Sequence, residues 1–593
     1  MRNPTSITTP KDAKLLSSSM TRAVFQWQQM GLFTVSLLLL PTANDGLIST
    51  KPPPSKQKQP QRQERATVTL VPPPGPFKWP IVGTLPDFFA RGGVDGMCEV
   101  HESMYKDYGT VYGMSLAGDE ELVVCDPRTF DEVLRKEGRF PVGAAEGVPT
   151  FTDYYKENDL KLAMKSSSRG PGWKEWRTSM NPDMVVMWET YLPSIADAAA
   201  KASAVAGSEV NKDGGRGNID FEQFISRLAF DMFSAVLFGE NPRTVDSSTA
   251  ERDDVEFVKN TQKAFDATGA LMSDPLAKMF GSDLYLDFVK SMDITFAFAT
   301  RRTKTFAEKA RREQRQHNED DTATDRSGKC PIQGIKSTAT DLLTNGKRNL
   351  SFVERLVGRN ELSDNDISEV TPLLLMAGVD TTAYVMSWLY LNLASNPDAQ
   401  EKLATELYDV LGGSDVTTAA QMESLPYLKA CLRESHRLTP TAPISVKTLE
   451  CDINIDVGDG TGRKCRVKAG RRISLNLRAF PMDPKYVKDP TKYTPERFLP
   501  EAIAKRRGTV SEIMDHPYFE DPFGRGKRKC LGGNVAHAEI MSATARLVQD
   551  WKISFPSSDN GVVERPQWKP KQKLMLKADP YPKLEMIPRT INL

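Results

Sequence analysis

The chain of 593 residues contains few histidines, little net charge and few cysteines. None of its five histidines belongs to an H-E-x-x-H motif or to a cluster with cysteine, so zinc chemistry and ligation of a haem by two histidines have no support. A formal net charge of +1 gives no reason to expect a nucleic-acid partner. The seven cysteines are scattered and odd in number, which favours a reducing compartment.

A long hydrophobic run is also missing near the N-terminus. The segment Gly31–Ala43 is apolar but short, and it contains Pro41, whereas a membrane-spanning helix needs about 20 apolar residues. It is typical of the apolar part of a signal sequence or of a weak anchor. Acids are rare around it, as in organelle transit sequences, and Thr50–Arg65 is rich in proline, glutamine and lysine. We therefore predict that residues 1–66 form a targeting or anchor segment followed by a disordered linker.

The most informative stretch of the sequence is Phe523–Gly532. It fits the pattern F-x-x-G-x-R-x-C-x-G at every fixed position and thereby resembles the haem-binding loop of the cytochrome P450 family. The resemblance implies that Cys530 is the axial ligand of a haem b iron. Because iron binds the thiolate, Cys530 is expected to have a lowered pKa, with the N-terminus of a following helix supplying the field. The alternative is a basic surface loop with an incidental buried cysteine.

The other fixed positions of this loop have physical roles in the resemblance. Gly526 and Gly532 lack a Cβ atom, so the backbone can turn sharply and approach a flat macrocycle closely. Arg528 offers a fork of donors that suits a haem propionate. Phe523 would shield the sulfur side from water.

Propionate contacts are also expected outside the loop. Trp173 and Arg177 form a W-x-x-x-R motif one helical turn apart, so both can face one haem propionate. Family members often carry a propionate-binding arginine at the position that Lys447 occupies here. Lysine is a point charge and not a fork, so we expect a weaker contact at Lys447 or none.

Two further signatures of the family lie upstream in the expected order. The first comprises E-x-x-R from Glu434 to Arg437 and the segment P-E-R-F, which contains Arg497. Residues three apart share a helix face, so Glu434 and Arg437 can pair. The resemblance implies that both join Arg497 in a buried charge triad that braces the proximal side of the haem. Such a network must be complete, and these three residues are interpreted as structural.

The second signature is A-G-V-D-T-T at Ala377–Thr382. It lies in an apolar pattern that predicts a helix over Ser363–Ser395, with a capping box at its start. The Ala-Gly pair alone could be a packing contact in a core helix. By the resemblance, Thr381 would hydrogen-bond dioxygen at the iron and its waters, and Asp380 would relay protons inward.

The resemblance implies a mainly α fold with small β-sheets (α+β), in one large helical domain over residues 67–593. The haem would lie between the long central helix and the helix that follows the cysteine loop. The stiff segment Pro72–Pro76 would start the domain, and the polar residues 318–337 are expected to form a disordered surface insertion. Hydrophobic spacing predicts a short strand and two helices, at Leu122–Cys125, Asp220–Phe238 and Ile294–Gln314.

Electrons must come from a separate protein, because no flavin-like or ferredoxin-like domain is visible in the chain. The segment Glu137–Pro141 resembles the mitochondrial branch of the family, in which two basic residues dock an acidic ferredoxin. Lys429 and Arg433 occupy those places, four apart on one predicted helix face. Three further cations would complete a basic patch that steers the donor, namely Arg525, Lys527 and Lys529. The alternatives are a solvated helix face and a flavoprotein reductase as the donor.

The activity implied by the resemblance is that of a haem-thiolate monooxygenase. It would insert one oxygen atom from O2 into a hydrophobic organic substrate, for which the mitochondrial branch suggests a sterol or another lipid. Leu375–Ala377 and Ala442–Val446 would line part of the substrate pocket. An isomerase that rearranges peroxides without O2 or a donor is one alternative, although the Asp380-Thr381 pair argues against it. A non-enzymatic haem-binding protein is the other.

The expected location is the mitochondrial inner membrane, to which the protein would bind peripherally. The endoplasmic reticulum membrane is the alternative that the Gly31–Ala43 run favours, and a plastid stays open. One departure weakens the match to the mitochondrial branch. That branch usually has two arginines after the Cys-x-Gly of the haem loop, where this chain has Gly533 and Asn534.

Overall fold

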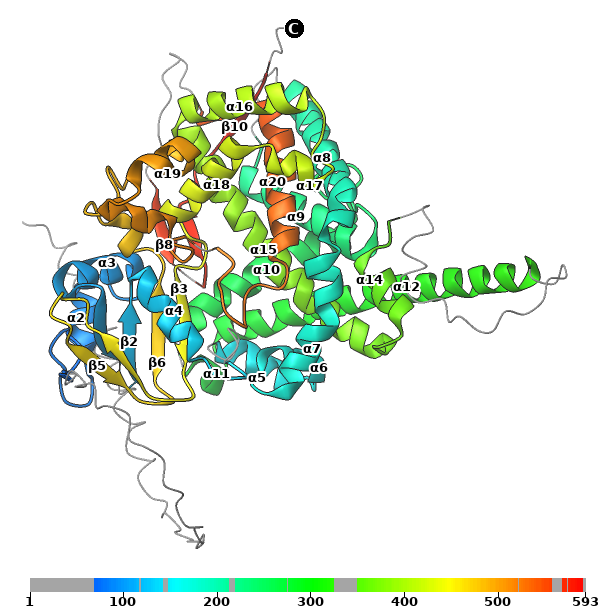
Figure 1. Cartoon of the computed structure of the whole chain (residues 1–593). Coiled ribbons are helices and arrows are strands. Elements are labelled where there is room, and N and C mark those ends of the chain that lie inside the picture. Colours follow the sequence, from blue (N-terminus) through cyan, green and yellow to red (C-terminus); the bar gives the residue numbers. More distant parts are fainter. Residues whose placement is uncertain are drawn as a thin grey trace, which may run out of the picture.

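The computed structural model describes residues 69–116, 119–141, 148–212, 219–272, 274, 276–324, 349–520, 522–556, 568–572 and 574–589. These residues form a mainly helical body with several small β-sheets (Figure 1). The predicted mainly α fold with small sheets is therefore confirmed. The predicted targeting segment, residues 1–66, lies outside the described residues.

Helices make up most of the body, and a few of them are single turns. The α-helices are α2 (Leu85–Ala90), α3 (Met97–Tyr108), α4 (Pro127–Arg135), α5 (Pro149–Glu157), α6 (Lys161–Ser167), α7 (Pro171–Asn181), α8 (Leu192–Lys212), α9 (Phe221–Phe238), α10 (Arg252–Leu271), α11 (Ala277–Phe280), α12 (Asp283–Thr324), α14 (Phe352–Arg359), α15 (Asp364–Ser395), α16 (Pro397–Leu411), α17 (Ala419–Glu423), α18 (Pro426–Leu438), α19 (Pro500–Arg506) and α20 (Gly533–Asp550). The tighter or wider turns are η2 (Pro182–Val186), η3 (Trp188–Tyr191), η5 (Phe480–Met482), η6 (Pro495–Phe498) and η7 (Val510–Asp515).

The strands form one four-stranded sheet and three two-stranded ribbons. They are β1 (Val111–Leu116), β2 (Asp119–Val124), β3 (Ile444–Thr448), β4 (Ile453–Asp456), β5 (Lys464–Val467), β6 (Arg472–Asn476), β7 (Trp551–Ser554), β8 (Lys569–Gln572), β9 (Leu576–Asp579) and β10 (Glu585–Pro588). The four-stranded sheet has the order β1-β2-β6-β3, in which β2 and β6 are parallel and the other pairs antiparallel. The ribbons pair β4 with β5, β7 with β10, and β8 with β9.

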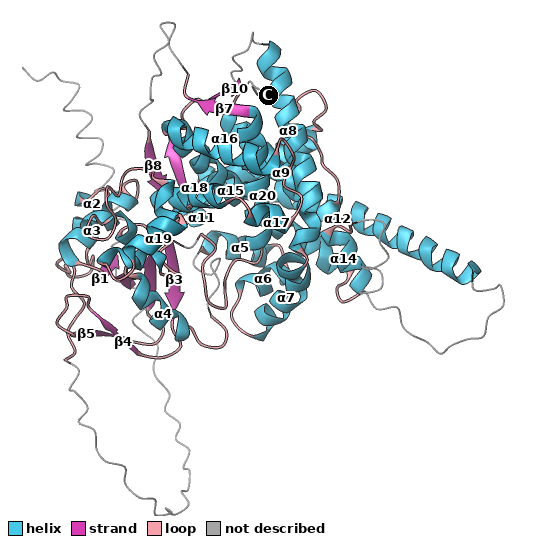
Figure 2. Ribbon diagram, turned by 45° about the horizontal axis from the view of Figure 1, so that its top comes forward, coloured by secondary structure: helices cyan, strands magenta, loops and turns pink. Residues whose placement is uncertain are grey.

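The long helix α15 begins as its sequence predicts. Ser363 Oγ accepts a hydrogen bond from Asp366 N (3.2 Å), and Asp366 Oδ2 accepts one from Ser363 N (3.1 Å), which completes the capping box. Among the described residues, α15 is the one helix long and apolar enough to cross a membrane, but most of its apolar window is buried inside the fold. It is therefore a core helix, and it lies against α9, α12, α18 and α20 (Figure 2).

Two of the predicted elements have nearly the predicted bounds. The helix expected at Asp220–Phe238 is α9, where Asp220 accepts a hydrogen bond from Gln223 N (3.1 Å) as its N-cap. The strand expected at Leu122–Cys125 is the last part of β2, which ends at Val124. Both segments are largely buried and are bounded by polar residues, so the spacing of their apolar residues was sufficient to predict where each element lies.

The predicted insertion at residues 318–337 is wrong in its first part. Residues 318–324 continue α12, the helix of which Ile294–Gln314 is only the middle, and the remaining residues of the predicted insertion lie outside the described ones. The end of α12 extends away from the body (Figure 1). A helix that leaves the core needs no apolar face, so a polar sequence gives no sign that the helix continues.

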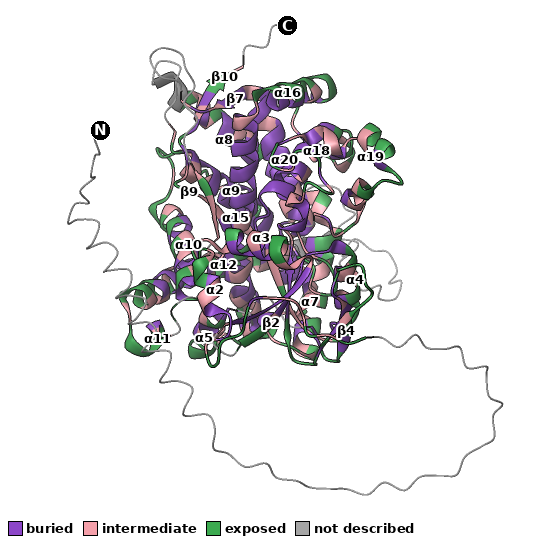
Figure 3. Ribbon diagram, turned by 90° about the vertical axis from the view of Figure 1, so that its left-hand side faces the viewer, coloured by how far each residue is buried: buried purple, intermediate pink, exposed green. Residues whose placement is uncertain are grey.

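The core is centred on α8, α9, α15 and α20, whose buried segments lie together in the middle of the body (Figure 3). Gly378 of α15 lies against the ring of Phe233 of α9, and a Cβ atom added to Gly378 would come within 2.6 Å of that ring. A larger residue would push the two helices apart. The glycine of the A-G-V-D-T-T signature is thus a packing contact, which the sequence left open as an alternative.

Candidate active site

The cysteine loop leads directly into α20. Cys530 N donates a hydrogen bond to Phe523 O (2.9 Å), which closes the loop and places the sulfur three residues before the helix. Gly526 has a positive φ of 79°, and a Cβ atom there would come within 2.6 Å of Glu137 Oε2. Glycine is therefore required at position 526, because other residues rarely adopt this positive φ and because a side chain would collide with Glu137. Gly532 has an ordinary φ of −87° and free space where its Cβ atom would be.

The prediction of a lowered pKa for Cys530 is wrong for the protein chain alone. Burial raises the pKa of the Cys530 thiol above its ordinary value, although the N–H of Gly532 and the charges of Arg177 and Lys529 favour the thiolate. The side chain of Cys530 is nevertheless exposed to solvent. The sulfur is thus accessible although protein surrounds it on most sides. A bound iron ion would supply the charge that deprotonates it.

One face of α15 is accessible although the helix lies in the core. Ala377 is exposed and Thr381 is partly exposed, while Val379 and Asp380 are fully buried. Residues four apart share a helix face, so Ala377 and Thr381 form an accessible stripe. Thr381 Oγ1 donates to Ala377 O (2.7 Å), which leaves its lone pairs free to accept a proton donor.

The predicted pocket residues of α15 separate into two groups. Ala377 belongs to the accessible stripe, but Leu375 is fully buried and Met376 nearly so. Successive helix residues are rotated by about 100°, so the three cannot face one pocket. From the second predicted segment, Ala442 and Val446 are exposed.

These observations fit haem b. The accessible stripe belongs to α15 and the accessible sulfur precedes α20, and the two helices lie side by side (Figures 1 and 2). Thr382 Oγ1 donates to Glu539 Oε2 of α20 (3.4 Å) and so joins the helices in the interior. An accessible sulfur, a glycine with free space beside it and a small-residue stripe are what a flat macrocycle with a thiolate ligand needs.

Three predicted propionate residues meet where α7 packs on the cysteine loop. The guanidinium of Arg528 lies 3.9 Å from the centre of the Trp173 ring. It donates to three backbone carbonyls, those of Pro141 (2.9 Å), Ser166 (3.1 Å) and Ser168 (2.5 Å). Arg177 Nη1 donates to Lys529 O (2.7 Å). These side chains therefore hold the loop against its neighbours.

Lys447 has a partner that the sequence did not reveal. Its Nζ lies 3.0 Å from Glu137 Oε1, and Glu137 is almost fully buried (2% exposed). Glu137 also faces Gly526, so this carboxylate joins β3 to the cysteine loop. The E-G-R-F-P segment drew attention to this position, but nothing in a sequence connects residue 137 with residue 447.

Asp380 is fully buried, and among the described residues neither of its carboxylate oxygens has a hydrogen-bond partner. Burial raises the pKa of Asp380 to about 8, Lys577 lowers it and Asp266 raises it. Thr261 is close enough to lower it slightly, but its hydroxyl already donates to Val258 O (2.9 Å). Asp380 is therefore largely protonated at neutral pH.

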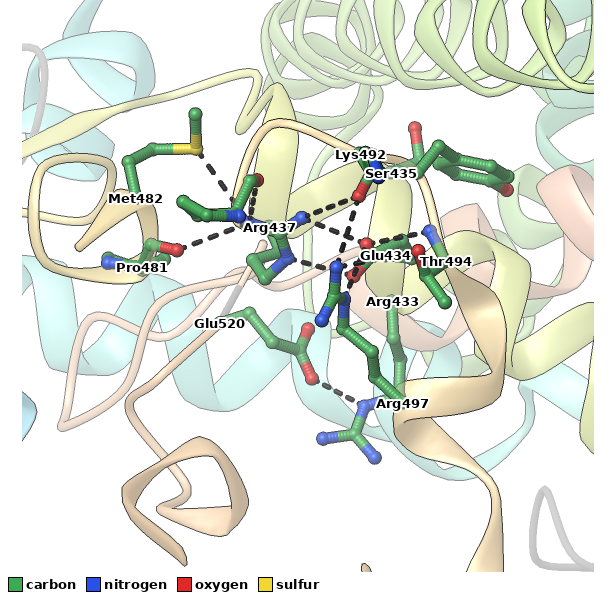
Figure 4. A network of polar contacts seen from close by, with 12 residues as sticks. Arg433, Glu434, Ser435, Arg437, Pro481, Met482, Lys492, Thr494, Arg497 and Glu520 are labelled. Atoms are coloured by element: carbon green, nitrogen blue, oxygen red, sulfur yellow. Dashed lines mark hydrogen bonds and ion pairs between the residues drawn. The ribbon is translucent and has the colours of Figure 1, made fainter. Parts of the chain in front are cut away.

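The charge triad is assembled in the fold (Figure 4). Glu434 accepts hydrogen bonds from Nε and Nη2 of Arg437 (both 2.8 Å) and from Nε of Arg497 (3.2 Å). Its fourth bond comes from Thr494 N (2.9 Å). Arg437 also donates to the carbonyl of Pro490 (2.7 Å), so the network fastens α18 to the segment before η6. Glu434 and Arg437 are both fully buried.

The predicted docking residues are not isolated cations. Lys429 pairs with Glu423, and Arg433 Nε lies 2.5 Å from Glu520 Oε1. The guanidinium of Arg433 also lies 4.2 Å from the centre of the Phe498 ring. The sequence analysis missed both acids, which partly neutralise the patch. The three loop cations of the predicted patch are exposed, namely Arg525, Lys527 and Lys529.

Comparison with known proteins gives a consistent result. The model of the family described as Cytochrome P450 matches residues 72–582. The chain is 22% identical to 1,25-dihydroxyvitamin D(3) 24-hydroxylase, mitochondrial, of Rattus norvegicus, over 83% of this chain and 85% of that protein. It is 23% identical to the human cholesterol side-chain cleavage enzyme, mitochondrial, over 82% and 84%, and 23% identical to the human sterol 26-hydroxylase, mitochondrial, over 80% and 83%.

Proposed function

The chain belongs to the cytochrome P450 family and is a haem b monooxygenase, and we propose that it oxidises a sterol or another lipid-like molecule with electrons from an acidic ferredoxin. One atom of O2 would enter the substrate and the other would leave as water, so each turnover needs two electrons and two protons from outside. The haem, when bound, supplies the activation of dioxygen. The observation that carries the proposal is the accessible stripe of α15 together with the accessible sulfur of Cys530.

The haem contacts are part of this proposal. Cys530 would bind the iron, and Phe523 at the closed end of the loop would shield the sulfur. Three side chains would supply donors to a propionate, namely Trp173, Arg177 and Arg528, and the two arginines would do so with the N–H groups not bonded to backbone carbonyls. Lys447 would share its charge between a propionate and Glu137, which makes it the weakest of these contacts.

The substrate class is supported by the apolar interior beside the stripe and by the names of the relatives. Aromatic and aliphatic side chains of α5, α10 and α12 pack with Met376 of α15 in one buried cluster, which would form the apolar wall behind the accessible stripe. Relatives over most of the chain act on sterols or on vitamin D(3) derivatives, as their names state. A rigid apolar molecule with few polar groups suits a site with apolar walls.

Replacing Thr381 with alanine should lower the product formed per electron by roughly tenfold or more, while electron use continues. The hydroxyl faces the accessible stripe, where protons must be delivered in order. Product, peroxide and reduced cofactor consumed are measured with purified protein, a ferredoxin, its reductase and a panel of sterols.

The matched control is Thr371→Ala. The hydroxyl of Thr371, ten residues earlier in α15, makes the same kind of bond to the carbonyl four residues before it, Ile367 O (2.8 Å), but it is fully buried and should not affect coupling. Product that forms without a donor, or a Thr381→Ala variant with normal coupling, would favour the isomerase. No turnover in the parent with any donor would favour a non-enzymatic haem-binding protein.

The electron donor would dock on the basic patch formed by α18 and the cysteine loop. Changing both Lys429 and Arg433 to glutamate should slow the reduction of the haem at least tenfold at low salt, with the difference fading as salt is added. Stopped-flow reduction by a ferredoxin measures this. Lys201→Glu on α8, an exposed lysine that pairs with Asp197, is the control. Equal reduction rates at low salt in parent and double variant would contradict the ferredoxin site.

A peripheral position on the mitochondrial inner membrane is the location we propose. Large apolar side chains are exposed before α2, among them Phe77 and Ile81, and around α11, among them Phe280 and Leu286. Exposed apolar groups of this size favour a membrane surface. Sedimentation with phospholipid vesicles tests the contact, and protein that stays in the supernatant would contradict it. A reporter fused to residues 1–66 would distinguish the mitochondrion from the endoplasmic reticulum and the plastid.

A further inference from the structure

Three elements converge on the buried carboxyl of Asp380. It projects from α15, and the neighbouring elements α10 and β9 contribute Asp266 and Lys577. Lys577 Nζ donates to both oxygens of Asp266 (2.9 and 3.1 Å). It also lies 4.9 Å from the centre of the ring of Tyr384, one helical turn after Asp380. None of these three partners belongs to a family signature in the sequence.

The three titratable side chains differ in exposure, from partly exposed to fully buried. The side chain of Asp266 is 36% exposed, that of Lys577 is 15% exposed and Asp380 is fully buried. An ammonium group has three donors, and two of those of Lys577 are used by Asp266. The third donor is not used by Asp266, and the oxygens of nearby Asp380 have no hydrogen-bond partner among the described residues. A lysine stem is flexible enough to serve two acids in turn.

The backbone that carries Lys577 is fixed from two sides. Trp388 Nε1 of α15 donates to Leu576 O (2.8 Å), and Leu576 N donates to Thr441 O (2.9 Å). Leu576 is fully buried. The residue before Lys577 is thus anchored on α15 itself, which holds the backbone of Lys577 beside the helix that carries Asp380.

We propose that Lys577 is a positioning residue for proton delivery, held by Asp266 and able to turn to Asp380 when that carboxyl gives up its proton. The positive charge stabilises the carboxylate that remains, so Asp380 releases its proton inward more readily. A proton from bulk solvent then returns Asp380 to its neutral form, and no electron is involved. The inference rests on the proposed role of Asp380 as a proton relay.

Few other groups face Asp380. The titratable ones are Lys577 from β9, Asp266 from α10 and Tyr384 from its own helix, and Glu222 of α9 acts on Tyr384. Burial raises the pKa of Tyr384, so this phenol stays neutral. Burial raises the pKa of Asp380 most, and the balance between one lysine and one partly exposed acid then adjusts how strongly Asp380 holds its proton.

The test follows the carboxyl itself and needs no turnover. In the full haem-loaded protein, the infrared band of a protonated carboxyl that is lost in Asp380→Asn is titrated with pH. Lys577→Met should make Asp380 about a tenfold weaker acid, because the cation that favours its charged form is gone. Asp266→Asn should make it a stronger acid, and Lys577→Arg should restore most of the parent behaviour. The solvent isotope effect on product formation should rise in Lys577→Met.

Lys571→Met is the matched control, because Lys571 lies on β8 of the same ribbon and pairs with Asp95 and Asp579. It should leave the titration unchanged. An unchanged titration in Lys577→Met, or an equal change in Lys571→Met, would overturn the inference. The proposed relay role fails separately, if Asp380→Asn leaves turnover and its solvent isotope effect unaltered.

Discussion

Cys530→Ala should abolish the strongly red-shifted Soret band that the reduced parent protein shows with carbon monoxide, together with all turnover. The sulfur is the one axial ligand that the loop offers, and its thiolate gives the band its position. The loop should survive the change. The side chain of Cys530 is accessible, so alanine leaves no cavity in the core, and the bond from Cys530 N to Phe523 O belongs to the backbone.

Cys451→Ala provides the control for this experiment. Cys451 is the other exposed cysteine among the described residues, whereas Cys98, Cys125, Cys431 and Cys465 are buried. The band should be unchanged in this variant. A red-shifted band that persists in Cys530→Ala would show that another group binds the iron. A parent band at the position typical of histidine-bound haem would reject the thiolate altogether.

The neighbouring residues Asp380 and Thr381 show what a sequence motif can encode. They are adjacent in the chain, but a helix rotates successive residues by about 100°. Thr381 therefore shares the accessible stripe with Ala377, while Asp380 points into the core toward α10 and β9. The motif thus places a hydroxyl on the accessible stripe and an acid in the core behind it, and a helical backbone gives the pair these two environments.

The parts of the fold that could be predicted are those with local causes. The start of α15 follows from a capping box within four residues, and α9 follows from apolar spacing with an aspartate cap. The far end of α12 could not be predicted, because a solvated helix lacks an apolar face. The residues of the candidate site could be proposed because a family resemblance joined motifs that are far apart in the sequence.

The partners of these residues could not be predicted, because they lie far away in the sequence. Arg528 bonds to a carbonyl 387 positions away, and Lys577 bonds to an acid 311 positions away. A sequence shows which charges exist, but the fold decides which of them meet. The pKa of Cys530 has the same origin, since burial by the assembled loop outweighs the nearby N–H and cations.

Replacing the carboxylate of Glu434 with an amide should lower the free energy of unfolding by about 3–5 kcal/mol. Glu434 is fully buried and compensates the charge of Arg437, which is also fully buried. The other described bonds of Arg437 that involve oxygen go to backbone carbonyls, so Glu434 is the acid on which its charge depends. Glutamine cannot accept from two guanidinium groups and the N–H of Thr494 at once. The loss is measured by denaturant unfolding of the haem-loaded protein, with the Soret band as the signal.

Glu423→Gln is the control, because its carboxylate pairs with Lys429 at the surface and is 80% exposed. Solvent screens that pair, so its loss should change stability by less than about 1 kcal/mol.

If the Glu434→Gln protein does not accumulate, the Arg497→Lys variant is measured in its place. Arg497 contributes one bond to Glu434 at 3.2 Å and is 12% exposed, so a lysine should cause an intermediate loss. Equal stability of parent and both triad variants would mean that the triad does not brace the cysteine-loop side of the fold. A graded loss, largest at Glu434, follows only if one buried carboxylate compensates both arginines.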